Sequence, residues 1–125
     1  MSRGVERTMA VNILVADDDK AMLNLYSRIF AGTAYTIATA ETFTEASALL
    51  RTKEYDLLIT DFMFPDGLGT ELIRLFNEGK QNARSLLVTG TPYARETLAY
   101  EGVLGYIEKP FKVDQFIEAV NKALA

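Results

Sequence analysis

Apolar and polar residues alternate along the chain in short runs that predict strands and helices in regular succession. Five short runs, apolar or β-branched, are typical of buried strands: residues 11–16, 35–40, 56–60, 85–89 and 105–107. The stretches after them repeat apolar residues at the spacing of one helical face. They predict five helices: residues 20–30, a helix after Thr42, and residues 70–77, 93–100 and 114–124.

Polar residues at the helix ends support this division. Asp19 is placed to cap the first helix through its side-chain oxygen, and Gly32 to end it. Thr42, followed three residues later by Glu45, predicts a capping box at the start of the second helix. Between the third strand and the third helix, residues 62–67 predict a turn-rich loop, because Pro65 and Gly67 favour turns.

Regular alternation predicts a parallel sheet, because two parallel strands need a connection of about a dozen residues, usually a helix. Right-handed connections then give an α/β fold with helices on both faces. We expect a flavodoxin-like, doubly wound, five-stranded parallel sheet in the order 2-1-3-4-5, with five helices in a three-layer α/β/α sandwich. Residues 11–125 would form this one domain. Residues 1–10 would be a flexible N-terminal lead-in, neither signal peptide nor membrane anchor.

Residues that could handle a phosphoryl group stand at the C-terminal ends of four predicted strands. Asp17 and Asp18 follow the first strand, Asp61 the third and Lys109 the fifth, while Thr89 closes the fourth. In the order 2-1-3-4-5 the first and third strands are neighbours at the switch point, where ligands bind beyond the carboxyl ends. The arrangement predicts a site for a divalent cation and a phosphoryl group, with Asp61 as the nucleophile.

Three carboxylates in one place repel one another unless a cation neutralises them. Mg²⁺ suits them, since it takes oxygen ligands and is commonly held by one or two carboxylates together with substrate phosphate. A zinc site is not expected, because the chain has neither His nor Cys. Gly90, beside Thr89, is small and would let a bulky phosphoryl donor approach.

Each of these residues also has a structural interpretation when taken singly. Asp17 and Asp18 could form a solvated turn, and Asp61 could cap a helix or a turn. Thr89 could be an ordinary strand residue, and Lys109 a surface residue before a helix-starting proline. Because all of them stand at the same end of four of the five predicted strands, the functional interpretation is favoured over coincidence.

Composition and net charge limit which classes of binding partner are expected. The net charge of -4 argues against non-specific binding of nucleic acid, which depends on Lys and Arg. The absence of Cys fits a reducing compartment, so we expect a cytoplasmic protein, and no apolar run is long enough for a membrane span. The absence of His means that the chain cannot supply a phosphohistidine itself. The phosphoryl donor must be another protein or a small acyl phosphate.

The strand-end motifs together resemble the receiver domain of two-component response regulators, of the chemotaxis-regulator fold type. The resemblance covers residues 12–125 and rests on five motifs: residues 13–18 (ILVADD), 56–61 (DLLITD), 65–67 (PDG), 87–90 (LVTG) and 105–111 (GYIEKPF).

The resemblance implies a role for each site residue. Asp61 would accept the phosphoryl group, and Mg²⁺, or Mn²⁺ in its place, would be held by Asp61 and three other groups. These are the carboxylates of Asp17 and Asp18 and the backbone carbonyl of Met63. Thr89 and Lys109 would contact the phosphoryl oxygens, and the peptide before Pro110 would be cis.

The resemblance also implies a switch and its partners. Phosphorylation would draw Thr89 toward the phosphoryl group and turn Tyr106 inward. This would change the face made by residues 93–100, 105–107 and 114–124. A histidine kinase or histidine phosphotransfer protein would be the donor. That face could bind a downstream target or a fused output domain, or form a homodimer. The protein would be a signalling domain rather than an enzyme acting on other substrates.

Two other functions remain possible from the sequence, and the chain departs from the receiver-family pattern in one respect. A phosphohydrolase of the haloacid dehalogenase type also uses an Asp nucleophile, but Ala21 stands where that family has Thr or Val. A pseudo-receiver would keep the fold as a binding module without phosphorylation. The departure concerns Met63, two residues beyond Asp61, and Thr91, two residues beyond Thr89, at positions that in the receiver family influence how readily water attacks the phosphoaspartate. The apolar Met63 cannot orient that water by a hydrogen bond. A long-lived phosphoryl group is therefore expected.

Overall fold

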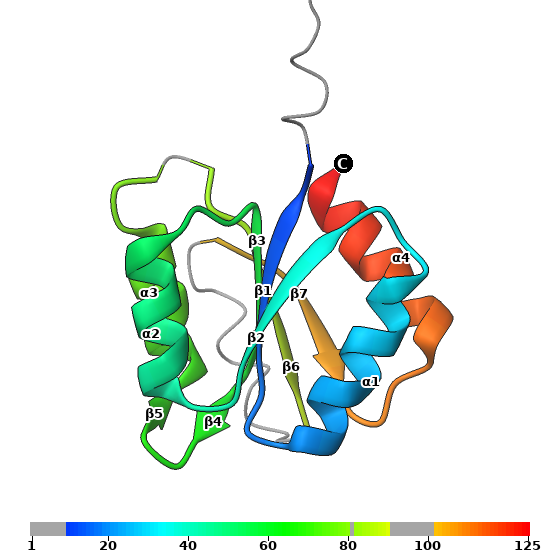
Figure 1. Cartoon of the computed structure of the whole chain (residues 1–125), viewed down its shortest axis with the longest axis horizontal. Helices are drawn as coiled ribbons and strands as arrows, with labels where there is room; N and C mark the ends of the chain where they lie inside the picture. The colour runs from blue at the N-terminus through cyan, green and yellow to red at the C-terminus, as the bar shows by residue number, and fades with distance from the viewer. Residues whose placement is uncertain (1–9, 81, 91–101) are drawn as a thin grey trace, which may run out of the picture.

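The computed structural model describes residues 10–80, 82–90 and 102–125, in which strands and helices alternate along the chain (Figure 1). Its elements are β1 (Asn12–Ala16), α1 (Lys20–Ala31), β2 (Thr36–Ala40), α2 (Phe43–Thr52), β3 (Leu57–Asp61), β4 (Met63–Phe64), β5 (Gly67–Leu68), α3 (Gly69–Asn77), β6 (Ser85–Thr89), β7 (Val103–Glu108) and α4 (Val113–Leu124). The helix expected over residues 93–100 lies outside the described residues, as does the expected lead-in apart from Ala10.

The main sheet has five parallel strands in the order β2-β1-β3-β6-β7, which confirms the predicted 2-1-3-4-5 arrangement. Helices α2 and α3 cover one face, and α1 and α4 cover the other (Figure 1). The flavodoxin-like, three-layer α/β/α architecture is therefore confirmed, with four of the five expected helices within the described residues.

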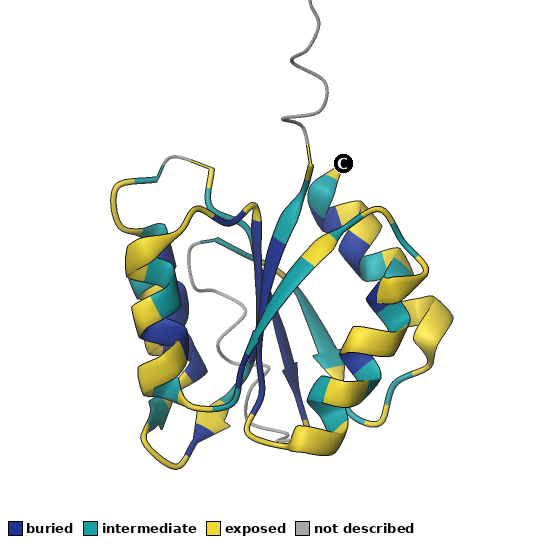
Figure 2. Cartoon of the chain, in the orientation of Figure 1, coloured by how far each residue is buried: buried dark blue, intermediate teal, exposed yellow. Residues whose placement is uncertain are grey.

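The core lies on both sides of the three central strands, which are buried almost throughout (Figure 2). Along β1, Ile13 and Val15 pack toward α1 and α4, while Leu14 and Ala16 pack toward α2 and α3. Because both faces are covered, these strands are continuous apolar runs rather than alternating ones. The apolar runs that predicted the strands thus reflect the two-sided burial.

The helix caps follow the sequence with one correction. Asp19 accepts a hydrogen bond from the Ala21 amide at 2.9 Å, and Thr42 accepts one from the Glu45 amide at 3.0 Å. The reciprocal bond of the predicted capping box differs, since the Glu45 carboxylate accepts from the Glu41 amide at 2.9 Å rather than from Thr42. The side chain of Glu45 thus fastens the residue that precedes the cap.

The predicted loop over residues 62–67 is more regular than expected. Its ends pair as the antiparallel hairpin of β4 and β5, with Met63 opposite Leu68 and Phe64 opposite Gly67. Pro65 and Asp66 form its two-residue turn. The period-2 pattern that reveals a strand cannot be seen in two residues. We refer to residues 63–68 as the hairpin.

Glycine is required where α3 starts, one residue earlier than predicted. The Gly69 amide donates to the Phe62 carbonyl at 2.7 Å. A Cβ atom on Gly69 would lie 1.9 Å from the carbonyl oxygen of Asp61. The hairpin can therefore return against the end of β3 only if residue 69 has no side chain.

No helix within residues 10–80, 82–90 and 102–125 has the length and apolar character needed to cross a bilayer. The helices α1 and α4, at 12 residues each, are well short of a span.

Gly69→Ala should lower the free energy of unfolding by about 3 kcal/mol, because the new methyl group meets rigid backbone. Gly32→Ala is the matched control, since its φ is -89° and the nearest atom to an added Cβ is 4.0 Å away. The control should change stability by less than about 1 kcal/mol. Urea unfolding of both variants measures the difference, and equal effects would contradict the close approach at Gly69.

Candidate functional site

Strand register brings the predicted site residues to one edge of the sheet. Ala16 of β1 pairs with Thr60 of β3, so Asp17 and Asp61 are the next residues on neighbouring strands. Asp61 in turn pairs with Val88 of β6, and Thr89 follows. The parallel sheet thus places the acidic ends of β1 and β3 side by side at the switch point, and Thr89 lies at the end of the neighbouring strand β6.

Three carboxylates gather at this edge. Ligand oxygens of Asp17, Asp18 and Asp61 all lie within 4.8 Å of one another. Their exposure differs, since Asp17 is 1% exposed, Asp61 is half-buried and Asp18 is open to solvent. The acidic cluster, as we call these three residues, therefore has a buried side and an open side.

Lys109 brings a positive charge to the acidic cluster from the end of β7. Its ammonium lies 2.8 Å from Asp17 Oδ2 and 3.2 Å from Asp61 Oδ2. The Lys109 amide also donates to the Thr89 carbonyl at 3.0 Å, which continues the pairing of β6 and β7 beyond the strand. The Lys109–Pro110 peptide is cis, as expected.

Backbone amides hold the remaining carboxylate oxygens. The Phe62 amide donates to Asp61 Oδ1 at 2.7 Å, and the Asp19 amide donates to Asp17 Oδ1 at 2.9 Å. Each of these two carboxylates therefore has one oxygen bound to an amide and the other bound to Lys109. Their orientation is set before any ligand binds.

The charges of this site shift its pKa values. Burial raises the pKa of Asp61, and the charge of Asp17 raises it further, while Lys109 opposes both. Burial lowers the pKa of Lys109, but Asp17 and Asp61 outweigh it, so the net shift is upward. The site therefore favours the charged form of Lys109 and, relative to a free carboxyl group, the protonated form of Asp61.

The residues fit a divalent cation. Three carboxylates face one ammonium group, which leaves an excess of negative charge at a site with an open side. All the ligand atoms on offer are oxygens, which Mg²⁺ prefers.

The other predicted residues lie on or next to the strands β4, β6 and β7. Met63, the first residue of β4, is 53% exposed, and Gly90 is exposed just after β6. Thr89 is buried at 2% exposure, and Tyr106 is half-buried on β7, where it packs against the core between the sheet and the helices α2 and α3. Thr91, two residues beyond Thr89, lies outside the described residues.

Tyr26 is a buried residue of α1 whose polar end was not among the predicted site groups. Tyr26 is 1% exposed, and its hydroxyl is close enough to interact with the Asp17 carboxylate. Burial raises the pKa of Tyr26, and the negative charges of Asp17 and Asp61 raise it further. A tyrosine in a core position needs a partner for its hydroxyl, and that need was the available signal.

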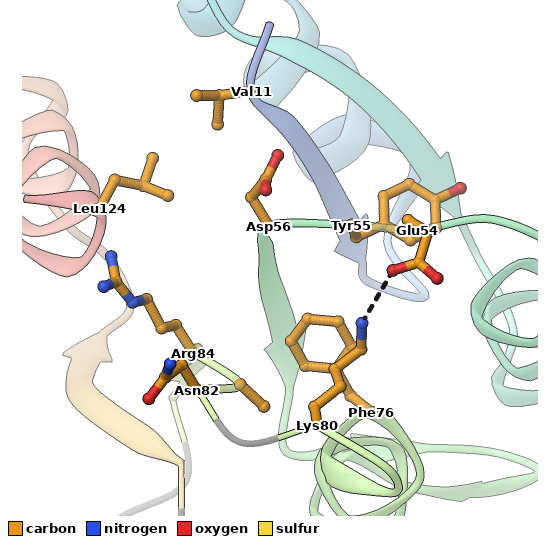
Figure 3. A pocket seen from close by; sticks show the side chains of 10 residues that line it. Val11, Glu54, Tyr55, Asp56, Phe76, Lys80, Asn82, Arg84 and Leu124 are labelled. Atoms are coloured by element: carbon orange, nitrogen blue, oxygen red, sulfur yellow. Dashed lines mark hydrogen bonds and ion pairs between the residues drawn. The ribbon is translucent and has the colours of Figure 1, made fainter. Parts of the chain in front are cut away.

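A cavity at the opposite, N-terminal ends of the strands is a weaker candidate for a ligand-binding site. This cavity of about 510 Å³ is lined by residues such as Asp56, Phe76, Lys80 and Arg84 (Figure 3). Its Lys80 ammonium already pairs with Glu54 at 3.3 Å and lies over the Phe76 ring. Its Arg84 side chain donates to the Ala123 carbonyl at 3.1 Å. These cations already have partners within the protein, so nothing there favours a particular ligand.

A doubly wound parallel sheet whose carboxyl edge gathers carboxylates and a lysine is typical of phosphoaccepting signalling domains. The family model for the response regulator receiver domain matches residues 13–121. The chain therefore belongs to the receiver domain family, whose members are phosphoacceptors of two-component systems.

Known relatives agree with this assignment. The chain is 27% identical to the DNA-binding transcriptional regulator NtrC of Azospirillum brasilense, over 92% of this chain and 24% of the relative. It is 28% identical to the response regulator MprA of Mycobacterium ulcerans, over 93% of this chain and 51% of that protein. The chain thus spans between about a quarter and about half of these relatives.

Solved structures are similar over nearly their whole length. The response regulator TrrA of Thermotoga maritima, in complex with Mg²⁺-BeF, is 31% identical with a TM-score of 0.82, covering 91% of this chain and 99% of that one. A CheY-like receiver domain protein of Methanospirillum hungatei is 26% identical with a TM-score of 0.84, covering 92% and 94%.

Without divalent cations, Asp61→Asn should raise the free energy of unfolding at neutral pH. The pKa of Asp61 is raised by burial from 3.8, so folding favours the protonated carboxyl. This contribution is complete below the unfolded-state pKa and is lost as the pH rises through the folded-state pKa. The uncharged asparagine avoids that loss.

Urea unfolding at neutral pH, and again below pH 3.8, checks this prediction. The gain of the variant should shrink toward zero at the lower pH. A variant that is less stable than wild type at neutral pH would show that Lys109 outweighs the burial of Asp61.

Proposed function

We propose that Asp61 accepts a phosphoryl group from a phosphohistidine of another protein. In this proposal residues 11–125 form the receiver unit, and Mg²⁺ or Mn²⁺ binds Asp17, Asp18, Asp61 and the carbonyl of Met63. The observation that carries it is the joint approach of the Lys109 ammonium to Asp17 and Asp61, within a cluster of three carboxylates.

The chain's own groups prepare the transfer. Phe62 and Lys109 hold the two oxygens of Asp61, so the carboxylate is oriented before the donor arrives. One Asp61 oxygen forms the new P–O bond while the P–N bond of the phosphohistidine breaks, and the bonding pair leaves with the imidazole nitrogen. Lys109 and the hydroxyl of Thr89 would then bind phosphoryl oxygens. A bound divalent cation would neutralise charge on the phosphoryl oxygens.

The phosphohistidine of this proposal belongs to another protein, because this chain contains no histidine. An apolar hollow of about 350 Å³ lies beside the acidic cluster, between α1 and the segment after β7. It is lined by Met22, Leu25, Lys109, Pro110 and Phe111. A histidine kinase or phosphotransfer protein could place an apolar helix face there, with its histidine toward Asp61.

The output is a change of conformational population. A phosphoryl group adds about 1.5 to 2 negative charges and three acceptor oxygens at Asp61. Thr89 would move toward it, and Tyr106 would turn into the space left at the end of β6. A few kcal/mol of differential stabilisation is enough to reverse a two-state population. A downstream target, a fused output domain or a second copy of this chain would bind the changed face.

Beryllium fluoride with Mg²⁺ mimics the acyl phosphate and tests this function. We expect amide chemical shifts to change around Asp61, Thr89 and Tyr106, because the mimic should engage the switch residues. The Asp61→Asn variant should show no such change, since it lacks the carboxylate. Unchanged spectra in the wild type would favour a pseudo-receiver that binds partners without phosphorylation.

The lifetime of the phosphoryl group is expected to depend on Met63. Its side chain is 53% exposed and offers a water no hydrogen-bond donor and only a weakly accepting sulfur. Met63→Asn should therefore speed dephosphorylation, by about tenfold if orienting the water lowers the barrier by roughly 1.4 kcal/mol. Loss of the phosphorylated species over time measures this, with Met63→Leu as the apolar control. Unchanged or slower decay in Met63→Asn would refute the role.

A further inference from the structure

The turn of the hairpin is fastened to the start of α2 by Asp66. Its Oδ1 accepts a hydrogen bond from the Phe43 amide at 2.9 Å. Its Oδ2 accepts bonds from the Thr44 amide at 3.0 Å and the Thr44 hydroxyl at 2.9 Å. These amides belong to the first turn of α2, where helical N–H groups have no partner within the helix.

This contact is a second cap, made from a distant part of the chain. Thr42 already caps α2 by accepting from the Glu45 amide, so Asp66 binds the amides that Thr42 leaves unpaired. The bonds from the Phe43 and Thr44 amides lower the pKa of Asp66. The carboxylate therefore stays ionised, and the contact intact, across the neutral and mildly acidic range.

Side-chain packing beside the turn reinforces the contact. A Cβ atom on Gly67 would lie 2.5 Å from the Phe43 ring, so the hairpin backbone lies directly against that ring. The other end of the hairpin is closed by the residues that flank it, because the amide of Gly69 donates to the carbonyl of Phe62 at 2.7 Å. Met63 lies between these two attachments, two residues after Asp61.

We propose that Asp66 is a positioning residue that holds the hairpin on α2, so that the Met63 carbonyl is kept at the acidic cluster and divalent cations bind more tightly. The inference rests on the proposed function, in which that carbonyl is a metal ligand. Outer groups that orient metal ligands commonly contribute tenfold or more in affinity. Mg²⁺ must then stabilise the contact of Asp66 with α2 by the same factor, because coupling between two equilibria is reciprocal.

The first measurement is a Mg²⁺ titration followed by amide chemical shifts in three proteins: wild type, Asp66→Ala and Thr42→Ala. Asp66→Ala should weaken Mg²⁺ binding by about tenfold. Thr42→Ala is the matched control, since it removes a cap from the same helix without touching the hairpin. It should lower the melting temperature by a similar amount and leave Mg²⁺ affinity within about twofold of wild type, because only stability responds to a lost cap.

The second measurement needs only the wild type and holds even if Asp66→Ala fails to fold. Mg²⁺ should slow hydrogen exchange at the Phe43 and Thr44 amides, which Asp66 binds. The Glu45 amide is the internal control, because its partner Thr42 lies on the same segment as the helix and not on the hairpin. Its exchange should be unaffected by Mg²⁺.

The outcomes separate this inference from the proposed function. Saturable Mg²⁺ binding by the wild type, with equal affinity in Asp66→Ala or with no selective protection of Phe43 and Thr44, overturns the role of Asp66 alone. Absence of saturable Mg²⁺ binding by the wild type overturns the proposed metal site and the role of Asp66 with it. Weakened binding in Asp66→Ala together with selective protection supports both.

Discussion

The structure depends most on the pairing of one ammonium group with two carboxylates at the switch point of the sheet. Lys109 lies 2.8 Å from Asp17 and 3.2 Å from Asp61, and Asp17 is 1% exposed. Leaving a buried charge without a partner is expensive, so the fold can bring two acidic strand ends together only because a third strand supplies the cation. Asp18 adds a further negative charge on the open side, which leaves the site ready for a divalent cation.

Strand register and side-chain packing next to the site hold Lys109, Asp17 and Asp61 in place. Parallel register sets Asp17 beside Asp61, and the continuous burial of the central strands fixes that register. Behind the site, the Tyr26 hydroxyl lies near Asp17, while its ring packs with Phe111 and Phe116 at centroid distances of 6.1 and 5.4 Å. The aromatic contacts connect α1 with α4 and with the segment that carries Lys109.

Much of the fold and of the candidate site could be predicted from the sequence, because these features depend on residues that are close together in the chain. Apolar runs identified the strands, Asp19 and Thr42 identified helix starts, and strand ends identified Asp17, Asp61 and Lys109. Other features depend on contacts between distant residues. The bonds from Asp66 to α2 span more than twenty residues, and the two-residue strands of the hairpin are too short to show a period. The helical pattern explains the place of Tyr26 by its apolar ring alone, and so it does not indicate that the hydroxyl lies near Asp17.

The central claim, that Asp61 is the phosphoacceptor of a metal-dependent receiver, is tested most directly by locating the modification. The protein would be treated with acetyl phosphate, with and without Mg²⁺, and the acyl phosphate reduced with borohydride to homoserine before peptide mass spectrometry. The account predicts homoserine at position 61, and only when Mg²⁺ is present. Homoserine in place of Asp17 or Asp18, or equal modification without Mg²⁺, would contradict it.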